Sequence, residues 1–559
     1  MALARARARA RAMKVSALCI ISLLIIIFSK SHALPSSSLD KDSICRTTPH
    51  ADHCNYILTS NRLHTIFDYG NISIHHSLSN ARSLLASVEH FLRLPSTSLE
   101  KVRALEDCRF LSDQNVDFLS QVSDGLSSFN ADDLDALLSA ALANVETCFQ
   151  GLESVPLASN IKDRLYRLNG TKSISVSLAV FRHWDHGDFT VTRRNLMVPK
   201  SDSIIERNSP LSLLMSTDKQ VIHEFATGKK DIEMLTNGNI SVAQVVVVSP
   251  RGDGQFTTIN DAIAAAPNNP GDSDQYFVIY VVTGIYEEHI SIPKNKQNLI
   301  LIGNGIGRTI ITGNRSTADG LTTFNTATFA VVGKKFIAVD ITFQNTAGPT
   351  KGQAVAVRNG AEKSVFYRCS FEGYQDTLYA HSARQFYREC DIYGTVDFIF
   401  GNAPVVFQKC NIYPRLPLPN QQTIITAQGR TDPNQRTGIS IDDCVIKATG
   451  DLASSSGAKK TYLGRPWKEY SRTVYVRSFM DSLIEPSGWI QWNRDYDSTL
   501  YYAEYKNNGP GSSTDYRVNW PGYHKDISST EVDQFSVSNF INGDKWLPAT
   551  GVPFNGDFH

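Results

Sequence analysis

The chain has little of what defines several common classes of protein. Its 559 residues carry 55 basic and 55 acidic side chains, so the cationic excess that nucleic-acid binding requires is missing. The histidines are scattered, and no pair of cysteines has the spacing of a zinc site. The glycine-rich stretch at 303–307 leads into a strand pattern rather than a helix, which argues against a phosphate-binding loop. We therefore expect no nucleic-acid partner, no bound metal and no organic cofactor.

Long apolar runs are also scarce, and the one near the N-terminus is typical of a secretory signal. Residues 1–33 hold six basic and no acidic side chains, and a largely apolar run at 15–28 precedes Ser31, His32 and Ala33, a small-residue cleavage site. The run has 14 residues, whereas a membrane span takes about 20. An uncleaved anchor is the alternative. We predict a secreted protein that loses residues 1–33 and has no stable membrane span.

Cysteine is present in a number that fits a secreted protein. Of the nine cysteines, Cys19 lies in the signal segment. The other eight are an even number, as expected where cysteines pair in disulfides. Sequons for N-glycosylation occur at Asn71, Asn169, Asn239 and Asn314. Both features favour the oxidising secretory pathway.

The first part of the mature chain, residues 34–185, is predicted to be helical. Leu/Ala-rich segments with helical spacing occupy 77–92, 105–126 and 132–152. Antiparallel packing of such helices predicts an all-α four-helix bundle. Four cysteines lie here and allow two links, Cys45 with Cys54 in one short segment and Cys108 with Cys148 between successive helices.

Residues 186–240 are interpreted as a linker, because they contain Gly, Asp, Lys and Ser among scattered apolar residues. The dibasic pair Arg193 and Arg194, followed by Asn195 and Leu196, is a candidate protease site in the secretory pathway. Two solvated arginines are the alternative interpretation.

Residues 241–559 change to short β-branched and aromatic runs separated by turns rich in Gly, Asn and Asp. The predicted strands lie at 245–248, 276–282, 299–302, 309–311, 329–332, 336–343 and 354–357. The spacing leaves no room for long helices between them, which excludes a doubly wound sheet. One helical stretch, at 258–266, is placed to cap the open end of a solenoid.

Two near-identical segments 21 residues apart determine the architecture of this part. The first contains Gly373 and Asp376, the second contains Gly394 and Asp397, and a weaker third copy begins at Phe407. Self-similarity at a period near 20 residues is the mark of a solenoid. Together with the short strands, it predicts an all-β right-handed parallel β-helix.

Stacking of equivalent positions places Asp376 and Asp397 on adjacent coils, about 4.8 Å apart. Two carboxylates this close cannot both ionise freely, which gives one acid and one carboxylate. Asp397 lies in an apolar segment and needs a partner, for which Arg465 is a candidate because a guanidinium group can hold a carboxylate with two hydrogen bonds. An ionised Asp397 suits a nucleophile and a protonated Asp376 suits a general acid and later a base. A capped turn or a set of calcium ligands is the alternative for such a pair.

Other polar and aromatic side chains belong to the same region. Gln375 precedes Asp376, and Gln353 lies about one coil earlier, so two amides are available to donate to a developing oxyanion. Flat apolar faces for sugar rings are expected from Trp467 and from Tyr374, Tyr379 and Phe400. Surface or ladder positions for the glutamines, and ordinary packing for the aromatics, are the alternatives.

A ladder of cysteines is expected to have a structural use. Cys369, Cys390 and Cys410 stack on adjacent coils, and Cys444 lies 34 residues beyond Cys410. We expect a disulfide that locks neighbouring coils in register, with Cys390–Cys410 favoured and Cys369–Cys390 and Cys410–Cys444 left open.

At these residues the chain resembles the plant pectinesterase (pectin methylesterase) family. The motifs that carry the resemblance, in order, are Gly-Ile-Tyr-Glu-Glu from Gly284, Gln-Ala-Val from Gln353, Gly-Tyr-Gln-Asp-Thr-Leu-Tyr from Gly373, Gly-Thr-Val-Asp-Phe-Ile-Phe-Gly from Gly394 and Leu-Gly-Arg-Pro-Trp from Leu463. The family fold is the right-handed β-helix. Residues 34–185 resemble the pectinesterase inhibitor domain that precedes the enzyme in many plant members, through the segments at 104–108 and 138–148.

The resemblance implies specific roles. Asp397 would be the nucleophile, Asp376 the proton donor, and Gln375 and Gln353 the groups that stabilise the transition state. Substrate contacts would come from Thr323, Arg465 and Trp467. The family also pairs the first two and the last two cysteines of the helical domain. Its processing motif is usually Arg-Arg-Leu-Leu, so the Arg-Arg-Asn-Leu found here leaves a mature start near residue 195 as a hypothesis.

These features together predict a secreted, monomeric carboxylic ester hydrolase of the plant cell wall. It would remove the methyl groups of galacturonate units in pectin (methyl-esterified homogalacturonan) and release methanol. The inhibitor-like domain would act within the chain or on a separate enzyme. One alternative is a polygalacturonase or lyase on the same solenoid, because carboxylates about 5 Å apart can perform glycosidic chemistry. Another is that only the helical domain is functional, as an inhibitor.

Overall fold

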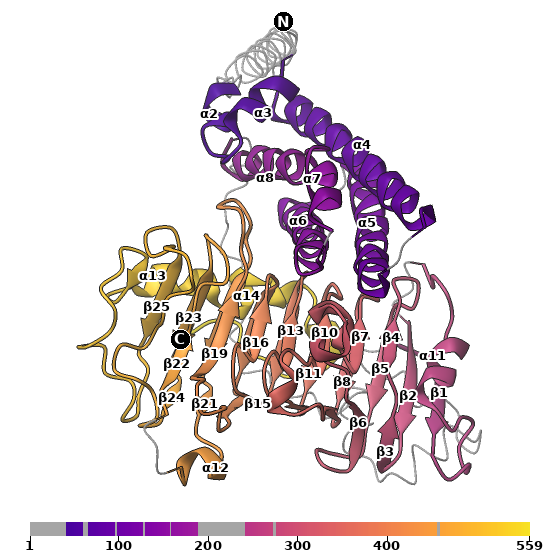
Figure 1. Ribbon diagram of the computed structural model, residues 1–559, viewed down its shortest axis with the longest axis vertical. Coiled ribbons are helices and arrows are strands. Elements are labelled where there is room, and N and C mark those ends of the chain that lie inside the picture. The colour runs from indigo at the N-terminus through magenta and orange to yellow at the C-terminus, as the bar shows by residue number, and fades with distance from the viewer. Residues whose placement is uncertain are drawn as a thin grey trace, which may run out of the picture.

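The computed structural model describes residues 41–59, 65–95, 98–126, 129–156, 158–187, 241–271, 275–455 and 459–558. Figure 1 shows two layers, a bundle of helices stacked on the side of a long solenoid of strands. The predicted signal segment, the Arg193-Arg194 site and the Asn239 sequon lie outside the described residues. No helix among the described residues is both long enough and apolar enough to cross a membrane.

The helical layer is built on four long helices, drawn in indigo and purple in Figure 1. They are α4 (Ile66–Arg93), α5 (Leu99–Gly125), α6 (Ala131–Glu153) and α8 (Gly170–Gly187). The shorter α2 (Lys41–Cys45) and α3 (Ala51–Ile57) precede α4, and α7 (Ser159–Tyr166) lies between α6 and α8. Polar caps define where the long helices begin, since the side chains of Thr65, Ser98 and Asn130 each accept a backbone N–H of the first turn. The predicted four-helix bundle is confirmed.

Two disulfides hold the bundle together. Cys45 is bonded to Cys54, with 5.5 Å between the Cα atoms, and Cys108 is bonded to Cys148, with 4.5 Å between them. The second bond joins α5 to α6. Both predicted pairs are confirmed.

The solenoid consists of three sheets whose neighbouring strands come from successive coils, which confirms the parallel β-helix. The eleven-stranded sheet contains β1 (Ser241–Val248), β2 (Gln275–Val281), β5 (Leu299–Ile302), β8 (Ile337–Val339), β11 (Ser364–Tyr367), β14 (Gln385–Arg388), β17 (Pro404–Gln408), β20 (Gly438–Asp442), β23 (Arg472–Val476), β25 (Tyr501–Tyr505) and β26 (Tyr523–His524). The eight-stranded sheet contains β3 (Gly284–Glu287), β6 (Thr309–Gly313), β9 (Thr342–Asn345), β12 (Ser370–Glu372), β15 (Asp391–Gly394), β18 (Asn411–Pro414), β21 (Val445–Ile446) and β24 (Phe479–Met480). The seven-stranded sheet, which faces the bundle, contains β4 (Ile290–Ile292), β7 (Phe329–Val331), β10 (Val357–Asn359), β13 (Leu378–Ala380), β16 (Ile399–Gly401), β19 (Thr423–Gln428) and β22 (Thr461–Gly464).

The strand register follows the sequence repeat. Phe366 of β11 pairs with Tyr387 of β14, and Leu378 of β13 pairs with Ile399 of β16, so each pair is 21 residues apart. Inside the solenoid the rings of Phe366 and Tyr387 stack with 5.1 Å between centroids, and those of Tyr387 and Phe407 with 4.7 Å. The repeat in the sequence therefore reflects aromatic side chains of successive coils that stack in the core.

The predicted single strand at 336–343 is wrong, because it is two strands of different sheets. β8 ends before Asp340 and β9 begins after it, and Asp340 has a positive φ of 58°. Arg368, Glu389 and Lys409 have the same left-handed backbone at the equivalent position of later coils, with φ of 51°, 53° and 55°. This corner is not visible as a glycine in the sequence, so the apolar residues on its two sides merge into one run.

The expected disulfide between coils is also wrong. Cys369, Cys390, Cys410 and Cys444 are all free thiols buried in the solenoid. Stacking in register makes the four side chains parallel, and each sulfur lies against main-chain carbonyl groups. Cys390 Sγ, for example, donates to the carbonyl oxygens of Phe366 at 3.4 Å and of Arg388 at 3.3 Å. The ladder fills the core as small apolar side chains instead of linking the coils.

Short helices cap the first coil of the solenoid and cover part of its outer face. The predicted cap at 258–266 is α11 (Ile259–Ala265), which begins where the Thr258 side chain accepts the N–H of Asp261. Near the C-terminus, α13 (Ser529–Val532) and α14 (Val537–Phe540) carry Val532, Val537 and Phe540 into an apolar cluster on the outer face of the eleven-stranded sheet. A further short helix, α12 (Gly450–Ala453), lies in a loop between β21 and β22.

Candidate active site

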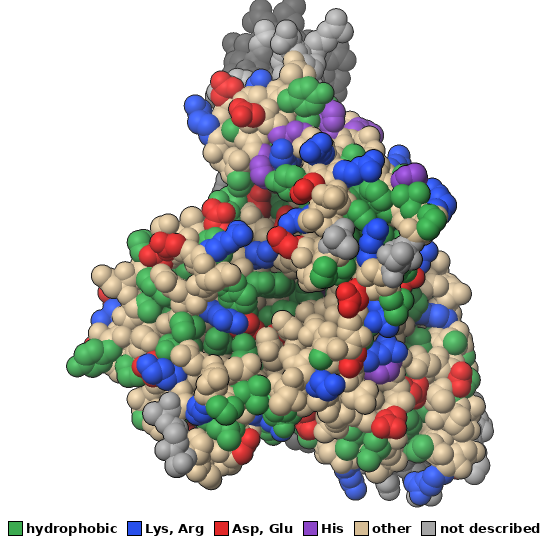
Figure 2. All heavy atoms as spheres, in the orientation of Figure 1, with side chains coloured by type: hydrophobic (Ala, Val, Ile, Leu, Met, Phe, Trp, Pro, Cys, Tyr) green, Lys and Arg blue, Asp and Glu red, His purple; other side chains and the backbone are tan. Residues whose placement is uncertain are grey.

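A cavity of about 440 Å³ lies where the bundle meets the seven-stranded sheet. The surface is hollowed at this junction, and hydrophobic side chains are visible within the hollow (Figure 2). The seven residues for which a catalytic or substrate-binding role was predicted all line the cavity, namely Thr323, Gln353, Gln375, Asp376, Asp397, Arg465 and Trp467. They come from five coils of the solenoid, and the first and last are 144 positions apart in the sequence.

Asp376 and Asp397 occupy the same place on adjacent coils. Each lies two residues before its strand, β13 or β16, and these strands pair with Leu378 opposite Ile399. The N–H of Asp376 donates to the carbonyl oxygen of Val396 at 3.0 Å. Both aspartates have left-handed backbone, with φ of 61° and 51°. The predicted stacking of the two positions is therefore confirmed, and both turns are held in a conformation that few non-glycine residues adopt.

A glycine three residues before each aspartate makes these turns fit. A Cβ atom added to Gly394 would lie 2.2 Å from Phe398 Cβ, and one added to Gly373 would lie 2.7 Å from Thr377 Oγ1. No larger residue fits beside the turn at either place. The repeated Gly-x-x-Asp pattern therefore reflects both the close packing of the chain and the placement of a carboxyl group at the cavity.

Arg465 holds the carboxylate of Asp397. Its Nε donates to Oδ1 at 2.8 Å and its Nη2 donates to Oδ2 at 2.6 Å. The guanidinium group lies over the ring of Trp492, 3.9 Å from the ring centroid. Trp492 was missed in the sequence, where it follows the buried Trp489 without a motif of its own. The predicted arginine partner of Asp397 is present in the structure.

The two carboxyl groups lie in different electrostatic surroundings. Burial, reinforced by the nearby Asp397 carboxylate and opposed by Arg465, raises the pKa of Asp376 well above its usual range. Burial also raises the pKa of Asp397, but the hydrogen bonds and charge of Arg465 oppose this rise. Asp397 is therefore the more acidic of the two groups. Arg465 thus favours the ionised form of Asp397, and burial beside that carboxylate favours the protonated form of Asp376.

The two glutamines lie on neighbouring coils, since the N–H of Ala354 donates to the carbonyl oxygen of Gln375 at 3.1 Å. Gln353 Oε1 accepts a hydrogen bond from Thr317 Oγ1 at 2.8 Å, so its amide presents the nitrogen as its donor end. Thr323 begins the short 3-10 helix η3 (Thr323–Thr326) at the edge of the cavity. Amide donors and carboxyl groups therefore border one space.

Aromatic side chains form one wall of the cavity. Tyr379 of β13 and Phe400 of β16 stack with 4.2 Å between ring centroids, and the ring of Trp467 stands edge-on to Phe400 at 5.9 Å. Tyr374, which we expected among them, does not line the cavity. It lies instead under Arg415, whose guanidinium group is 4.0 Å from its ring centroid.

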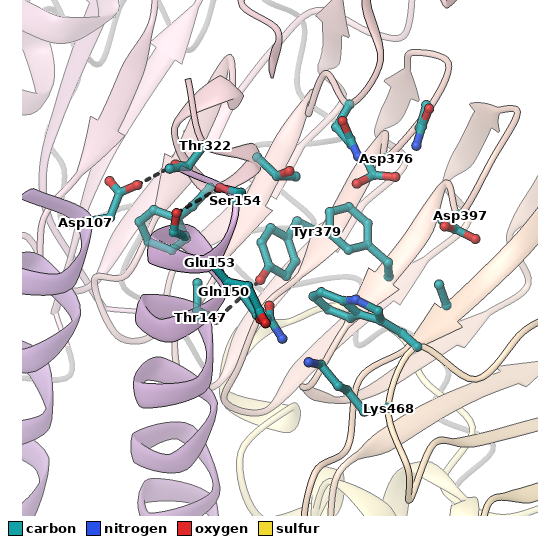
Figure 3. A pocket seen from close by; sticks show the side chains of 18 of the residues that line it. Asp107, Thr147, Gln150, Glu153, Ser154, Thr322, Asp376, Tyr379, Asp397 and Lys468 are labelled. Atoms are coloured by element: carbon teal, nitrogen blue, oxygen red, sulfur yellow. Dashed lines mark hydrogen bonds between the residues drawn. The ribbon is translucent and has the colours of Figure 1, made fainter. Parts of the chain in front are cut away.

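The helical bundle provides the opposite wall. Thr147, Gln150 and Glu153 of α6 and the following Ser154 line the cavity on the bundle side, where Thr147 lies against Tyr379 (Figure 3). On α5, Asp107 accepts hydrogen bonds from Thr322 and Asn325. Sequence reasoning missed this wall, because these contacts join residues more than 200 positions apart and no repeat or motif links them.

Comparisons with known proteins agree with this geometry. The family model described as pectinesterase matches residues 245–544. The chain belongs to the pectinesterase family. It is therefore a carboxylic ester hydrolase. A second model, described as plant invertase/pectin methylesterase inhibitor, matches residues 41–180. The resemblance found in the sequence is confirmed, whereas the limits of 34–185, 186–240 and 241–559 stay predictions.

Individual relatives match either most of the chain or only part of it. The chain is 49% identical over 531 residues to a probable pectinesterase/pectinesterase inhibitor 20 of Arabidopsis thaliana, covering 92% of this chain and 93% of that protein. It is 44% identical over 541 residues to pectinesterase 2 of Citrus sinensis, covering 96% and 98%. A solved structure of carrot pectin methylesterase is 51% identical with a TM-score of 0.55, and covers 56% of this chain and 98% of the carrot chain. The carrot protein thus corresponds in length to the solenoid part alone.

Proposed function

We propose that the solenoid hydrolyses the C6 methyl esters of galacturonate units in pectin by way of a covalent acyl-enzyme. Asp397 attacks the ester carbonyl carbon, and the amides of Gln353 and Gln375 donate hydrogen bonds to the oxyanion that forms. Asp376 gives its proton to the departing methanol. It then takes a proton from water, which attacks the acyl-enzyme and restores Asp397. The products are methanol and a galacturonate carboxylate.

The observation that carries this proposal is the unequal pair of carboxyl groups. Asp397, held by two hydrogen bonds from Arg465, is ionised and fixed in orientation, as a nucleophile must be. Asp376 has a pKa raised by burial and by its neighbour, as a group that donates a proton near neutral pH must have. Trp467, Thr323 and Arg465 would contact the polymer, with the stacked rings of Tyr379 and Phe400 as a flat apolar surface.

The proposal is tested with Asp397→Ala in the solenoid domain. We expect the variant to fold and to release no methanol from methylated pectin above the rate without enzyme. A matched control is Asp391→Ala, which removes a carboxylate of β15 that bonds Asn411 and lies outside the cavity. Undiminished methanol release by Asp397→Ala would refute the assignment. The appearance of new reducing ends without methanol would instead favour glycosidic chemistry.

We further propose that the helical bundle acts within the chain to keep the enzyme inactive. Thr147 Oγ1 lies 2.9 Å from Nε2 of His381, and residues of α6 occupy one wall of the cavity where a polymer would lie. The bundle would leave after cleavage near Arg194. We also propose that the protein is secreted to the plant cell wall, since pectin is an extracellular polymer, and that its sequons are glycosylated on the way. It would act there as a monomer. The N-terminal sequence of the extracellular protein, obtained by mass spectrometry, tests the cleavage.

A further inference from the structure

A row of basic side chains runs along one end of the seven-stranded sheet. Four of its neighbouring strands, β4, β7, β10 and β13, are each followed within four residues by Lys294, Lys334, Lys363 and Arg384 respectively. Arg436 continues the series after β19. Because parallel strands lie about 4.8 Å apart, the first four cations repeat at about that interval along the solenoid. We call these five residues the cation row.

The cation row runs parallel to the catalytic residues. Gln353, Asp376 and Asp397 precede β10, β13 and β16, whereas the cation row follows the strands of the same sheet. These three strands have three residues each, which corresponds to about 10 Å. A linear polymer beside the cavity would therefore pass along several of the cations.

Acidic side chains of the bundle lie on this row in the intact chain. On α5, Asp113 and Asp117 both contact Lys294, the former at 2.6 Å. One turn further along the same helix face, Gln121 Oε1 accepts from Lys334 Nζ at 2.8 Å.

The first turn of α6 continues the acidic surface along the row. Asp133 lies 3.6 Å from Lys363 Nζ and also pairs with Arg384. Asp132 accepts from Arg436 Nη1 at 2.8 Å. In the intact chain the cation row thus binds several carboxylates that lie along a line.

The solenoid itself neutralises little of this charge. Arg384 pairs with Glu362 of the solenoid as well as with Asp133 of the bundle. For Lys294, Lys363 and Arg436, the acids paired with them among the described residues all belong to the bundle. Removal of the bundle would therefore leave at least three exposed cations without their partners beside the active site.

We propose that the cation row is a binding site for a linear polymer of carboxylates, and that the solenoid domain without its bundle uses it to bind stretches of pectin already freed of their esters. De-esterified galacturonate presents one carboxylate per sugar, the same group that the bundle places on the row. The identity of the polymer rests on the proposed function. The assignment of a site for carboxylates does not rest on the proposed function, because it follows from the ion pairs between the cation row and the bundle.

The test compares two double variants of the solenoid domain, residues 241–559, which the carrot chain shows to be a separate folding unit in this family. Lys294→Gln/Lys363→Gln removes two cations of the row. Lys409→Gln/Lys447→Gln removes two exposed cations outside the cation row, and Lys409 shares the positive φ of Lys363, so the backbone change is matched. Binding to polygalacturonate is measured at low salt, where such charges are least screened.

We expect the first variant to bind about tenfold more weakly than the unchanged domain, because two partly exposed cations are lost, and the second to bind as the unchanged domain does. The full-length chain, whose row is covered, should bind as weakly as the first variant. Equal binding by the two variants, or full-length chain that binds as tightly as the domain, would overturn the inference.

Polygalacturonate carries no ester, so this binding does not depend on esterase activity. Methanol release from methylated pectin by the same proteins separates the two claims. Row-dependent binding without methanol release would contradict the proposed function and leave the polyanion site standing. Methanol release with binding that ignores the row would contradict the inference alone.

Discussion

Arg465 donates hydrogen bonds of 2.8 and 2.6 Å to the two carboxylate oxygens of Asp397, which lies two coils earlier in the solenoid. Arg465 follows β22, whereas Asp397 precedes β16, and β19 lies between these strands in the sheet. The pair therefore depends on the register of three neighbouring strands. It links the architecture of the solenoid to the charge of the proposed nucleophile.

Replacing Arg465 by lysine should weaken methanol release and shift its pH dependence. Lysine keeps the charge but cannot make the two parallel hydrogen bonds, so a charge-assisted bond of about 1.5–3 kcal/mol is lost, which corresponds to roughly 10–100-fold in kcat. The pKa of Asp397 should rise because Arg465 lowers it in the native site. The acidic limb of the pH profile should therefore move to higher pH. A profile identical in shape to that of the unchanged enzyme would contradict this role.

The sequence predicted those parts of the fold that arise from local repetition. The 21-residue period predicted the stacking of Asp376 on Asp397, because equivalent positions of successive coils lie above one another in a parallel solenoid. The disulfides of the bundle were predictable because Cys108 and Cys148 lie on successive helices. Asp397 lies in an apolar segment and required a cation, for which Arg465 in the Leu-Gly-Arg-Pro-Trp motif was the candidate.

Other parts were beyond sequence reasoning for identifiable reasons. Asp340 adopts the left-handed backbone of a corner without being glycine, so the break between two strands carried no compositional signal. The contact of Asp107 with Thr322 joins two domains and follows no period. The four parallel thiols beginning with Cys369 looked like a ladder of potential disulfides, although stacking alone does not turn sulfur atoms toward each other.

The free thiols of the solenoid can be counted directly. The domain 241–559 contains four cysteines, all buried and unpaired. Reaction with Ellman's reagent should detect almost no thiol in the folded domain and four per chain after denaturation. Two thiols per chain in denaturant would mean that one pair of coils is linked, and would restore the disulfide that the structure excludes.

Enlarging a single helical glycine should release the bundle from the cavity. A Cβ added to Gly151 of α6 would lie 3.7 Å from Thr322 Cγ2, so the longer side chain of Gly151→Leu must push against the solenoid. Overpacking of this kind destabilises a contact by about 1–3 kcal/mol, so methanol release by the full-length chain should rise about fivefold or more. Gly170→Leu is the matched control, since a Cβ there meets nothing within 4 Å. An equal response of both variants, or none in Gly151→Leu, would contradict the proposed inhibition.

Asp107 should make the docking of the bundle depend on pH. Burial in the contact raises the pKa of this carboxyl from 3.8 to about 7, against hydrogen bonds from Thr322 and Asn325. The docked form therefore holds the proton. Its stabilising contribution is complete below about pH 4 and is lost as the pH rises through about 7.

The comparison of the full-length chain with its Asp107→Asn variant isolates this contribution. Asparagine fits the same space and cannot ionise, so the variant should remain docked at pH 8 where the unchanged chain begins to open. His381 has the opposite effect on docking, because burial and Arg358 lower its pKa to about 3 and its protonation at low pH therefore opposes docking. Both proteins contain His381, so its effect cancels when their rates are compared. Methanol release by the unchanged chain relative to the variant should rise about tenfold or more between pH 5 and pH 8. A ratio that stays constant over this range would show that Asp107 has the same protonation state in the docked and the open chain. The buried carboxyl would then not control the opening of the cavity.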